Sequence, residues 1–400
     1  MDRASNPFMP GAGQPPKVLA GREEDLEVLA AAFHRVKAKL APRSIVFHGL
    51  RGVGKTVLLV QAQRIAASER PILLSAEAGK RNKSLFEDLL PSLAREVRRA
   101  NLGKRAGHAF TGLATFLQSA ASVFKVKIAG IDIGVDPPDA DKRDAVGDIE
   151  TDFEDALMLL AEAAEAADTT VALTVDELHL CDEASLNALV TTIHRANQLQ
   201  RPLLLIGAGL PPVLEALATA KSYSERLFDL RRVDALNADE AAHALTEPLR
   251  QEGVTIETAV IDRVFEKTAG YPYFLQVWGE ALWNAAETSP ITLATLAKAE
   301  PVALKSLDEG FFATRLAKRT KKQKRYLRAM AELPGEEKKT AEIARLLEID
   351  ITRTSSTRQT LIDHGLIYSP EDKRVAYTVP LFGLFLKRTL PLEPWDAPED

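Results

Sequence analysis

Four short segments in the first 210 residues are candidate strands. They are Arg43–His48, PILLSAE (71–77), VALTVDE (171–177) and PLLLIGAG (202–209). The last two are continuous rather than alternating apolar runs, which are typical of parallel strands that are buried on both faces. Segments with helical apolar spacing separate these runs. An alternation of strands and helices predicts a three-layer α/β core with a parallel sheet.

The second half of the chain changes to helical spacing. From about Val233, the segments ADEAAHALTEPLRQEG, ETAVIDRVFEKTAG and YFLQVWGEALWNAAE predict a helical lid. Beyond Thr320, three more helical segments precede IYSPEDKRVAYTV, which alternates like two short strands around a charged tip. Three helices followed by a β-hairpin predict a C-terminal winged helix-turn-helix.

These patterns divide the chain into five parts. Four prolines among the first 16 residues predict an extended arm. The predicted parts are an arm over 1–20, an α/β core over 21–232, a helical lid over 233–315, a winged helix over 316–390 and a tail over 391–400. Residues near 124–137 alternate around Gly130 and predict a hairpin inserted in the core, to which we assign no role.

Composition limits the location and the partners. With 46% hydrophobic and 27% charged residues, the 400-residue chain resembles ordinary soluble proteins. A single cysteine excludes an internal disulfide framework, and no run of about 18 apolar residues suits a membrane span. We therefore expect a cytoplasmic protein without a membrane partner.

The net charge of −5 hides an asymmetry. Residues 315–388 contain 17 Lys+Arg against 9 Asp+Glu, a surplus of +8 that leaves −13 for the rest. A basic C-terminal segment can bind an anionic partner, or it can be a solvated charged face. The pattern alone leaves both interpretations open.

One short stretch carries the strongest chemical signal. The sequence GLRGVGKT (49–56) matches G-x-x-x-x-G-K-[ST] between a predicted strand and a predicted helix. Glycines let backbone N–H groups approach a phosphate, and the helix N-terminus adds its positive end. The lysine would reach the β- and γ-phosphates of ATP, and the threonine would bind Mg²⁺. The residues expected to bind ATP here are Gly49, Arg51, Gly52, Val53, Gly54, Lys55, Thr56 and Val57.

A P-loop needs a carboxylate partner. The run VALTVDE ends in Asp176 and Glu177, 120 residues past Thr56. We expect Asp176 to hold Mg²⁺ through water and Glu177 to polarise the attacking water as general base. Two acids after an apolar run can also form an ordinary strand-end turn, but the P-loop favours the catalytic interpretation.

These motifs carry a family resemblance. Together, NPFMPGAGQPPKVLAGREEDLEVL, GLRGVGKT, TVDE and AGYPYFLQ resemble a bacterial AAA+ ATPase, and the likeness spans about residues 6–390. The chain is similar to the branch that includes origin-recognition initiators, archaeal ATPases and STAND NTPases. The resemblance implies that Gly21 and Arg22 lie beside the adenine, that the Pro-rich arm helps to close the pocket, and that Pro272 belongs to a GxP motif of the ATP site.

By the same resemblance, Arg226 stands where an arginine finger is expected, which would complete a neighbouring subunit's site. Arg231 or Arg232 could replace it, and a surface salt bridge is an equal alternative. The chain departs from the family in two places. At the end of the fourth predicted strand, residues 207–209 are Gly-Ala-Gly, where many AAA+ proteins have a polar residue called sensor 1. In the lid segment AGYPYFLQ, no arginine stands at the position called sensor 2. Both departures predict slow hydrolysis and a nucleotide-controlled switch.

The predicted winged helix supplies the candidate DNA contacts. They are side chains able to bind phosphates or base edges. The candidates are Arg353, Ser355, Ser356, Arg358, Lys373 and Arg374. Glu371 and Asp372 at the wing tip weaken this interpretation, and winged helices also serve as protein-contact modules. His48, His179 and His364 lack metal-ligand spacing, so we expect them to pack or to support other residues.

The sequence therefore predicts an ATP-hydrolysing AAA+ switch that uses ATP and Mg²⁺. It would associate with double-stranded DNA, and form homo-oligomers or bind a partner protein. The alternative is a STAND-like signalling or defence ATPase, in which nucleotide gates a protein partner. A P-loop kinase for a small molecule is a third hypothesis, less favoured because a lid and a winged helix have no role in it.

Overall fold

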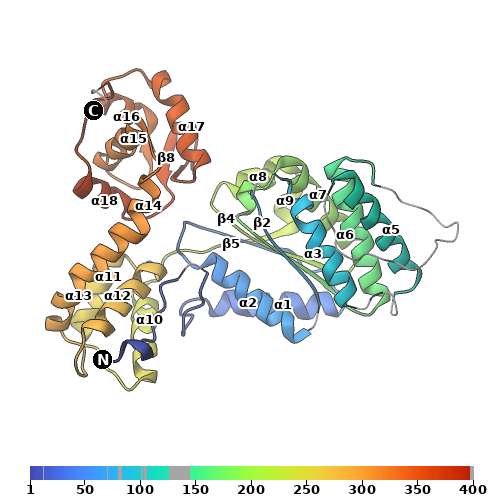
Figure 1. Ribbon diagram of the computed structural model, residues 1–400, viewed down its shortest axis with the longest axis horizontal. Helices are drawn as coiled ribbons and strands as arrows, with labels where there is room; N and C mark the ends of the chain where they lie inside the picture. The colour runs from blue at the N-terminus through green and yellow to red at the C-terminus, as the bar shows by residue number, and fades with distance from the viewer. Residues whose placement is uncertain are drawn as a thin grey trace. The chain divides into compact units, whose positions relative to one another are not determined.

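The computed structural model describes residues 1–11, 13–69, 71–79, 83–100, 102, 106–125 and 145–396. The predicted hairpin at 124–137 falls outside these ranges from residue 126 onward. The chain forms two compact units (Figure 1). The core unit contains Arg22–Gly49 and Lys55–Val233, and the C-terminal unit contains Met1–Gly21, Leu50–Gly54 and Asp234–Asp400.

A parallel sheet organises the core unit. Within the described residues the sheet has five strands in the order β2-β3-β4-β1-β5. Its strands are β1 (Ser44–His48), β2 (Ile72–Glu77), β3 (Val171–Asp176), β4 (Leu203–Gly209) and β5 (Phe228–Arg232). All four strand pairs are parallel, which confirms the predicted α/β class.

Helices cover both faces of this sheet. They are α1 (Glu23–Lys37), α2 (Lys55–Glu69), α3 (Leu85–Arg99), α5 (His108–Val123), α6 (Ile149–Ala166), α7 (Glu183–Gln198), α8 (Val213–Ala220) and α9 (Ser224–Leu227). Figure 1 shows α1 and α2 together on one face and α6 and α7 on the other. Val46 and Leu173 pack in one apolar cluster with α3, α5, α6 and α7, while Phe47 and Ile206 are equally buried. Burial on both faces explains the continuous apolar runs.

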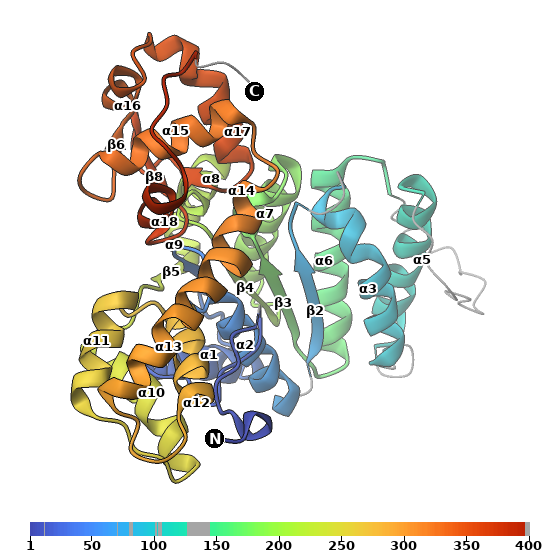
Figure 2. The same ribbon diagram turned by 60° about the vertical axis from the view of Figure 1, so that its left-hand side comes forward.

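The C-terminal unit begins with a helical bundle. Its helices are α10 (Ala238–Gln251), α11 (Thr258–Thr268), α12 (Pro272–Ala285) and α13 (Leu293–Ser306), which Figure 2 shows packed together. A π-helical segment, Leu307–Phe312, connects α13 to α14 (Ala313–Leu316) without a break. Helices α10, α11 and α12 match the three helical segments that the sequence predicted after Val233, whereas α13, the π-helical segment and α14 were not predicted.

The three helices and the two-stranded hairpin that the sequence predicted after Thr320 are present, together with a short strand and a final helix that it did not predict. The helices are α15 (Lys321–Glu332), α16 (Thr340–Leu346), α17 (Ser355–Asp363) and α18 (Phe382–Thr389). The strands are β6 (Lys338–Lys339), β7 (Ile367–Tyr368) and β8 (Arg374–Tyr377), and they pair antiparallel in the order β6-β8-β7. We call residues 321–389 the C-terminal module.

The N-terminal arm packs against α12. Phe8 is buried beside Gly279, where any side chain on the helix would overlap its ring. The indole Nε1–H of Trp283 donates to the Asp2 carbonyl at 2.7 Å, and the Asn6 amide donates to Asn284 at 3.1 Å. A helix glycine and two side chains of α12 therefore fix the arm. Contrary to the prediction of an extended arm, residues Arg3–Ser5 form a short 3₁₀ helix, whose first turn is capped by the Asp2 side chain. In the described part of the chain, no helix is long and apolar enough to cross a membrane.

The turn before α12 depends on a glycine. Gly270 has a φ of +71°, and an ideal Cβ there would clash with the carbonyl oxygen of Leu236. The same Gly270 accepts a 2.9 Å hydrogen bond from the Leu236 N–H. The glycine is therefore required both by the left-handed backbone and by the close approach of another chain segment.

We expect Gly270→Ala to destabilise the C-terminal unit more than Gly253→Ala does. Gly253 has a nearly equal φ of +72°, but an ideal Cβ there meets nothing within 4 Å. The control, Gly253→Ala, should therefore lose about 1 kcal/mol of unfolding free energy from backbone strain alone. Gly270→Ala should lose about 3 kcal/mol, because the backbone at Leu236 must also move away from the new methyl group. Urea denaturation measures both. Equal losses would show that the contact with Leu236 contributes nothing.

Candidate nucleotide-binding and catalytic site

The predicted P-loop connects β1 to α2. Gly49 N–H donates to the Gly209 carbonyl at 3.3 Å, which ties the start of the loop to the end of β4. Gly52 and Gly54 have φ angles of +87° and +104°. An ideal Cβ on Gly54 meets nothing within 4 Å, so the backbone conformation alone requires glycine at that position.

The first residues of α2 turn back toward the loop and the sheet edge. Lys55 is 9% exposed, and its Nζ donates to the Gly49 carbonyl at 2.8 Å. The Thr56 hydroxyl donates to Oδ2 of Asp176 at 2.7 Å. Asp176 is the last residue of β3, so the structure brings together two predicted Mg²⁺ ligands that are 120 residues apart. Val53 is buried and Val57 half-buried, so any contact of these two residues with phosphate would come from the backbone N–H groups rather than from the apolar side chains.

The chemistry of this pair suits Mg²⁺. A hydroxyl and a carboxylate are hard oxygen donors, and Mg²⁺ commonly takes one or two protein oxygens and completes its shell with water and phosphate. Among the described residues, no group of three or more His, Cys, Asp or Glu could hold a metal by itself. The Thr56 hydroxyl and the Asp176 carboxylate are therefore suitable ligands for Mg²⁺, with water and phosphate completing its shell.

Glu177 follows Asp176 in an unusual backbone conformation. Its φ of 51° and ψ of 36° are left-handed, which is uncommon for a residue with a Cβ. Its N–H donates to Oδ1 of Asp176 at 2.8 Å. Its Oε2 lies 3.5 Å from Nδ1 of His179. Strained residues of this kind occur at functional sites, and the sequence pattern did not foresee either the strain or the histidine contact.

The tip of the loop, Leu50–Gly54, groups with the C-terminal unit. Arg51 N–H donates to the Thr378 carbonyl at 3.0 Å, and the Gly52 carbonyl accepts from the Tyr273 N–H at 3.3 Å. Two residues expected to bind ATP therefore also contact α12 and the segment after β8. The sequence pointed to this part of α12 only through Pro272, the neighbour of Tyr273, and it gave no signal near Thr378.

Arginine charge gathers close to this tip. Burial, and next the nearby Arg51, lower the pKa of Arg315 to about 10. The Arg315 guanidinium lies over the ring of Phe311, 3.8 Å from its centroid, and donates to the Phe311 carbonyl. Phe311 in turn stacks on Tyr273 with centroids 4.8 Å apart. The π-helical segment thus holds a cation beside α12.

The residues expected beside the adenine lie in different units and are described separately. Gly21 has a φ of +64°, and an ideal Cβ would lie 2.6 Å from Cδ of Glu240. Arg22 is 9% exposed and precedes the first turn of α1. Pro272 is the first residue of α12, where proline suits a helix start. The role of these residues toward nucleotide stays a prediction.

Two of the candidate finger arginines differ in their surroundings. Arg231 donates to Oδ1 of Asp25 and to Oε1 of Glu24, both at 2.7 Å. Burial alone would lower its pKa, but these hydrogen bonds outweigh burial and raise it. Arg226 is exposed on α9, and the described residues give its guanidinium no partner. Arg231 is therefore engaged within its own unit, whereas Arg226 is accessible.

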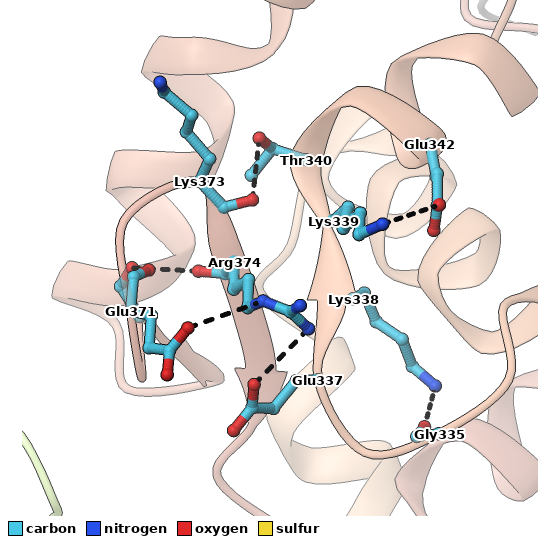
Figure 3. Close-up of polar contacts among 10 residues, drawn as sticks. Gly335, Glu337, Lys338, Lys339, Thr340, Glu342, Glu371, Lys373 and Arg374 are labelled. Atoms are coloured by element: carbon cyan, nitrogen blue, oxygen red, sulfur yellow. Dashed lines mark hydrogen bonds and ion pairs between the residues drawn. The ribbon is translucent and has the colours of Figure 1, made fainter.

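The candidate DNA contacts are only partly accessible. Arg353 forms two hydrogen bonds with Asp396, at 2.9 and 3.2 Å. Figure 3 shows Arg374 between Glu337 and Glu371, each at 3.6 Å. Lys373 lies 3.6 Å from the exposed carboxylate of Asp372. Ser355 and Ser356 are exposed at the start of α17, and Arg358 is half-buried.

Part of the basic surplus lies inside the C-terminal module. Arg325 is 4% exposed and donates to Glu393 and to the Trp395 carbonyl, both at 3.0 Å. Arg328 is buried and donates to the Leu390 carbonyl at 2.9 Å. These two arginines attach the segment after α18 to α15. They are therefore unavailable to an external anion.

Comparisons with known families agree with this geometry. Residues 18–206 match the family model described as AAA ATPase domain. Residues 309–386 match a domain of unknown function, DUF8462. The comparison with curated proteins gave no significant match.

Solved structures were compared over nearly the whole chain. A Walker-type ATPase of Pyrococcus abyssi matches with a TM-score of 0.59 at 16% identity, covering 95% of this chain and 100% of that chain. The Orc1 protein of Aeropyrum pernix in complex with DNA matches with 0.46 at 16% identity, covering 94% of each chain. The RuvB Holliday junction branch migration motor of Thermotoga maritima matches with 0.46 at 16% identity, covering 95% and 100%. Residues 18–206 thus resemble an AAA ATPase domain, and the chain shares the fold of a Walker-type ATPase.

Proposed function

We propose that this cytoplasmic protein binds and hydrolyses ATP with Mg²⁺ and acts as a nucleotide-controlled switch. The observation that carries the proposal is the 2.7 Å hydrogen bond from Thr56 to Asp176. It joins the helix after the P-loop to the end of a central parallel strand, the edge at which ligands of open α/β sheets bind. The AAA ATPase match over residues 18–206 supports the same activity.

Each residue has a distinct task in this proposal. Lys55 stabilises phosphate charge with its ammonium group. Thr56 and Asp176 would hold Mg²⁺, the first directly and the second through water, and a bound metal would supply positive charge against the phosphates. Glu177 accepts a proton from the attacking water. Arg226 of a neighbouring copy supplies a cation to the transition state, so the active form is an oligomer.

We also propose that the C-terminal module is a winged helix that associates with double-stranded DNA. Its order of elements, α15-β6-α16-α17-β7-β8, and its antiparallel sheet β6-β8-β7 support that assignment. Ser355, Ser356 and Arg358 on α17 would contact the phosphate backbone, with Lys373 at the wing. Arg353 and Arg374 would contact DNA only if phosphates replaced the carboxylates that now pair with them.

A specific observation also favours the alternative, a nucleotide-gated switch for a protein partner. Arg353 and Arg374 are paired with carboxylates, and Arg325 and Arg328 are buried. The module thus presents less positive charge than its composition suggests. A surface of mixed charge is more typical of protein contacts than of DNA contacts.

Two substitutions should separate nucleotide binding from turnover. Lys55→Ala removes a charge-assisted contact to phosphate and should weaken ATP binding about 100-fold. Glu177→Gln keeps that contact and should bind ATP with parent affinity, but lose about 10² to 10⁴ in kcat. Fluorescent-ATP titration and phosphate release measure the two properties. Parent-like behaviour of both variants would show that the site assignment is wrong.

Arg226 and Arg231 should respond differently to alanine. Arg226→Ala should leave the unfolding free energy within about 0.5 kcal/mol and lower kcat roughly 10³-fold in the oligomer. Arg231→Ala should cost about 2 kcal/mol of stability, because the largely buried Asp25 carboxylate loses its partner. Urea denaturation and ATPase rates at rising protein concentration are the measurements. The opposite result would move the finger to Arg231.

Salt-dependent DNA binding tests the second half of the proposal. Glu177→Gln protein should bind random double-stranded DNA in a nucleotide-dependent manner, and more weakly at about 200 mM than at about 50 mM salt. Arg358→Ala should lower the slope of log affinity against log salt by about one. Arg263→Ala on α11 is the matched control and should change nothing.

The nucleotide arms of this experiment decide between the two functions. Binding is measured with ATP, with ADP and without nucleotide. An absence of DNA binding in all three states, with tight retention of ADP, would favour the protein-partner switch and reject DNA association.

A further inference from the structure

Strand β4 ends without a polar side chain, and its neighbours explain why. The strand closes with Gly-Ala-Gly at 207–209. An ideal Cβ on Gly207 would lie 2.8 Å from Cδ2 of the buried Leu178, and one on Gly209 would lie 3.3 Å from the backbone N of His179. The 3₁₀ helix η2 (Leu178–Leu180) therefore packs directly against the strand end and leaves little room for a larger residue.

The polar group that reaches this strand end comes from η2 itself. The His179 side chain is 7% exposed. Its Nδ1 accepts a 3.2 Å hydrogen bond from the N–H of Leu210, the residue that follows β4. The same Nδ1 lies 3.5 Å from Oε2 of Glu177. One ring nitrogen thus stands between the end of β4 and the proposed general base.

The two contacts of Nδ1 exclude each other chemically. A ring nitrogen that accepts from an N–H carries no proton, so in the neutral ring the proton is on Nε2. In that tautomer Nδ1 has no hydrogen to give to the Glu177 carboxylate, and 3.5 Å is longer than a normal hydrogen bond. The tautomer with a proton on Nδ1 can donate to Glu177 but cannot accept from Leu210. The imidazole therefore bonds either to the strand end or to Glu177.

Glu177 is a residue whose orientation such a contact can control. Its backbone is anchored, because its N–H is bound by Asp176 at 2.8 Å. Its side chain is 25% exposed, so water is available as a competing partner for the carboxylate. Side-chain torsions rather than backbone motion therefore decide where the carboxylate points.

We propose that His179 is a positioning residue for Glu177, in place of the polar side chain that β4 lacks. The proposal rests on Glu177 being the general base of the proposed function. When Leu210 N–H occupies Nδ1, the ring is held by the sheet. When the end of β4 moves and releases Nδ1, the ring changes tautomer and holds the Glu177 carboxylate in place for its water. The His179 ring thus couples the position of the strand end to hydrolysis.

Two substitutions at this position form a matched pair. His179→Phe keeps a ring but removes the nitrogen, and it should lower kcat about 10 to 100-fold, as loss of a supporting contact does. Its affinity for a fluorescent ATP analogue should stay within about two-fold of the parent. His179→Asn places an amide near the Nδ1 position and should recover kcat to within about five-fold. His34→Asn, an exposed histidine in the same unit, is the control.

Two measurements test the contact without relying on turnover. Nitrogen-15 spectra of histidine-labelled protein should show His179 with an unprotonated Nδ1 in the nucleotide-free state. Hydrogen exchange of the Leu210 amide should be at least about 10-fold faster in His179→Phe than in the parent. A protonated Nδ1, or unchanged exchange at Leu210, overturns the proposal.

The kcat, stability and ATP affinity of the His179 variants also test the proposal. Parent-like kcat in His179→Phe overturns the proposal, and so does loss of stability or ATP binding in both His179 variants, which would make the ring a packing group. A failure of the proposed function shows elsewhere, as parent-like ATP binding by Lys55→Ala. The two failures are therefore distinguishable.

Discussion

The parallel register of β1, β4 and β3 is the constraint on which the site depends. His48 of β1 stands opposite Gly209 of β4, and Val175 of β3 stands opposite Gly207. Because these strands run in one direction, the segments that follow them leave the sheet at the same edge. The Thr56 to Asp176 hydrogen bond spans that edge. A slip of one residue would reverse every side chain of a strand and separate these groups.

The sequence predicted the centre of this core because β3 and β4 are buried on both faces and are therefore almost entirely apolar. The edge strand β2 was recognised by its short apolar run Ile72–Leu74, although its second half is partly exposed. The sequence did not predict β5, whose residues FDLRR mix apolar and charged side chains. That strand lies at the edge of the sheet. Arg231 is tolerated there because α1 supplies Glu24 and Asp25. The compensation comes from residues about 200 positions away, so no local pattern could reveal it.

The charge of the basic C-terminal segment also could not be judged from the sequence, because most partners of its buried arginines are distant along the chain. Arg325 and Arg328 lie in the run KRTKKQKRYLR, which local charge counting treats as one solvated or anion-binding surface. In the folded chain Arg325 contacts Glu393 and the Trp395 carbonyl, and Arg328 contacts Glu332 and the Leu390 carbonyl. A sequence window shows how much charge is present. Only the fold shows which charges are already satisfied by their own chain.

The free energies involved suit a switch rather than a fixed contact. A left-handed conformation at Glu177 costs about 1 to 2 kcal/mol, and a hydrogen bond between neutral groups contributes about 1 kcal/mol. The Leu210 bond joins neutral groups, whereas a bond from His179 to the Glu177 carboxylate is charge-assisted and contributes about 1.5 to 3 kcal/mol, so the two differ by only about 0.5 to 2 kcal/mol. A change of about 1.4 kcal/mol at the end of β4 would shift the balance between them about ten-fold. A strand end that carried its own polar side chain would fix that contact directly, whereas the Gly-Ala-Gly end leaves the choice to one histidine ring.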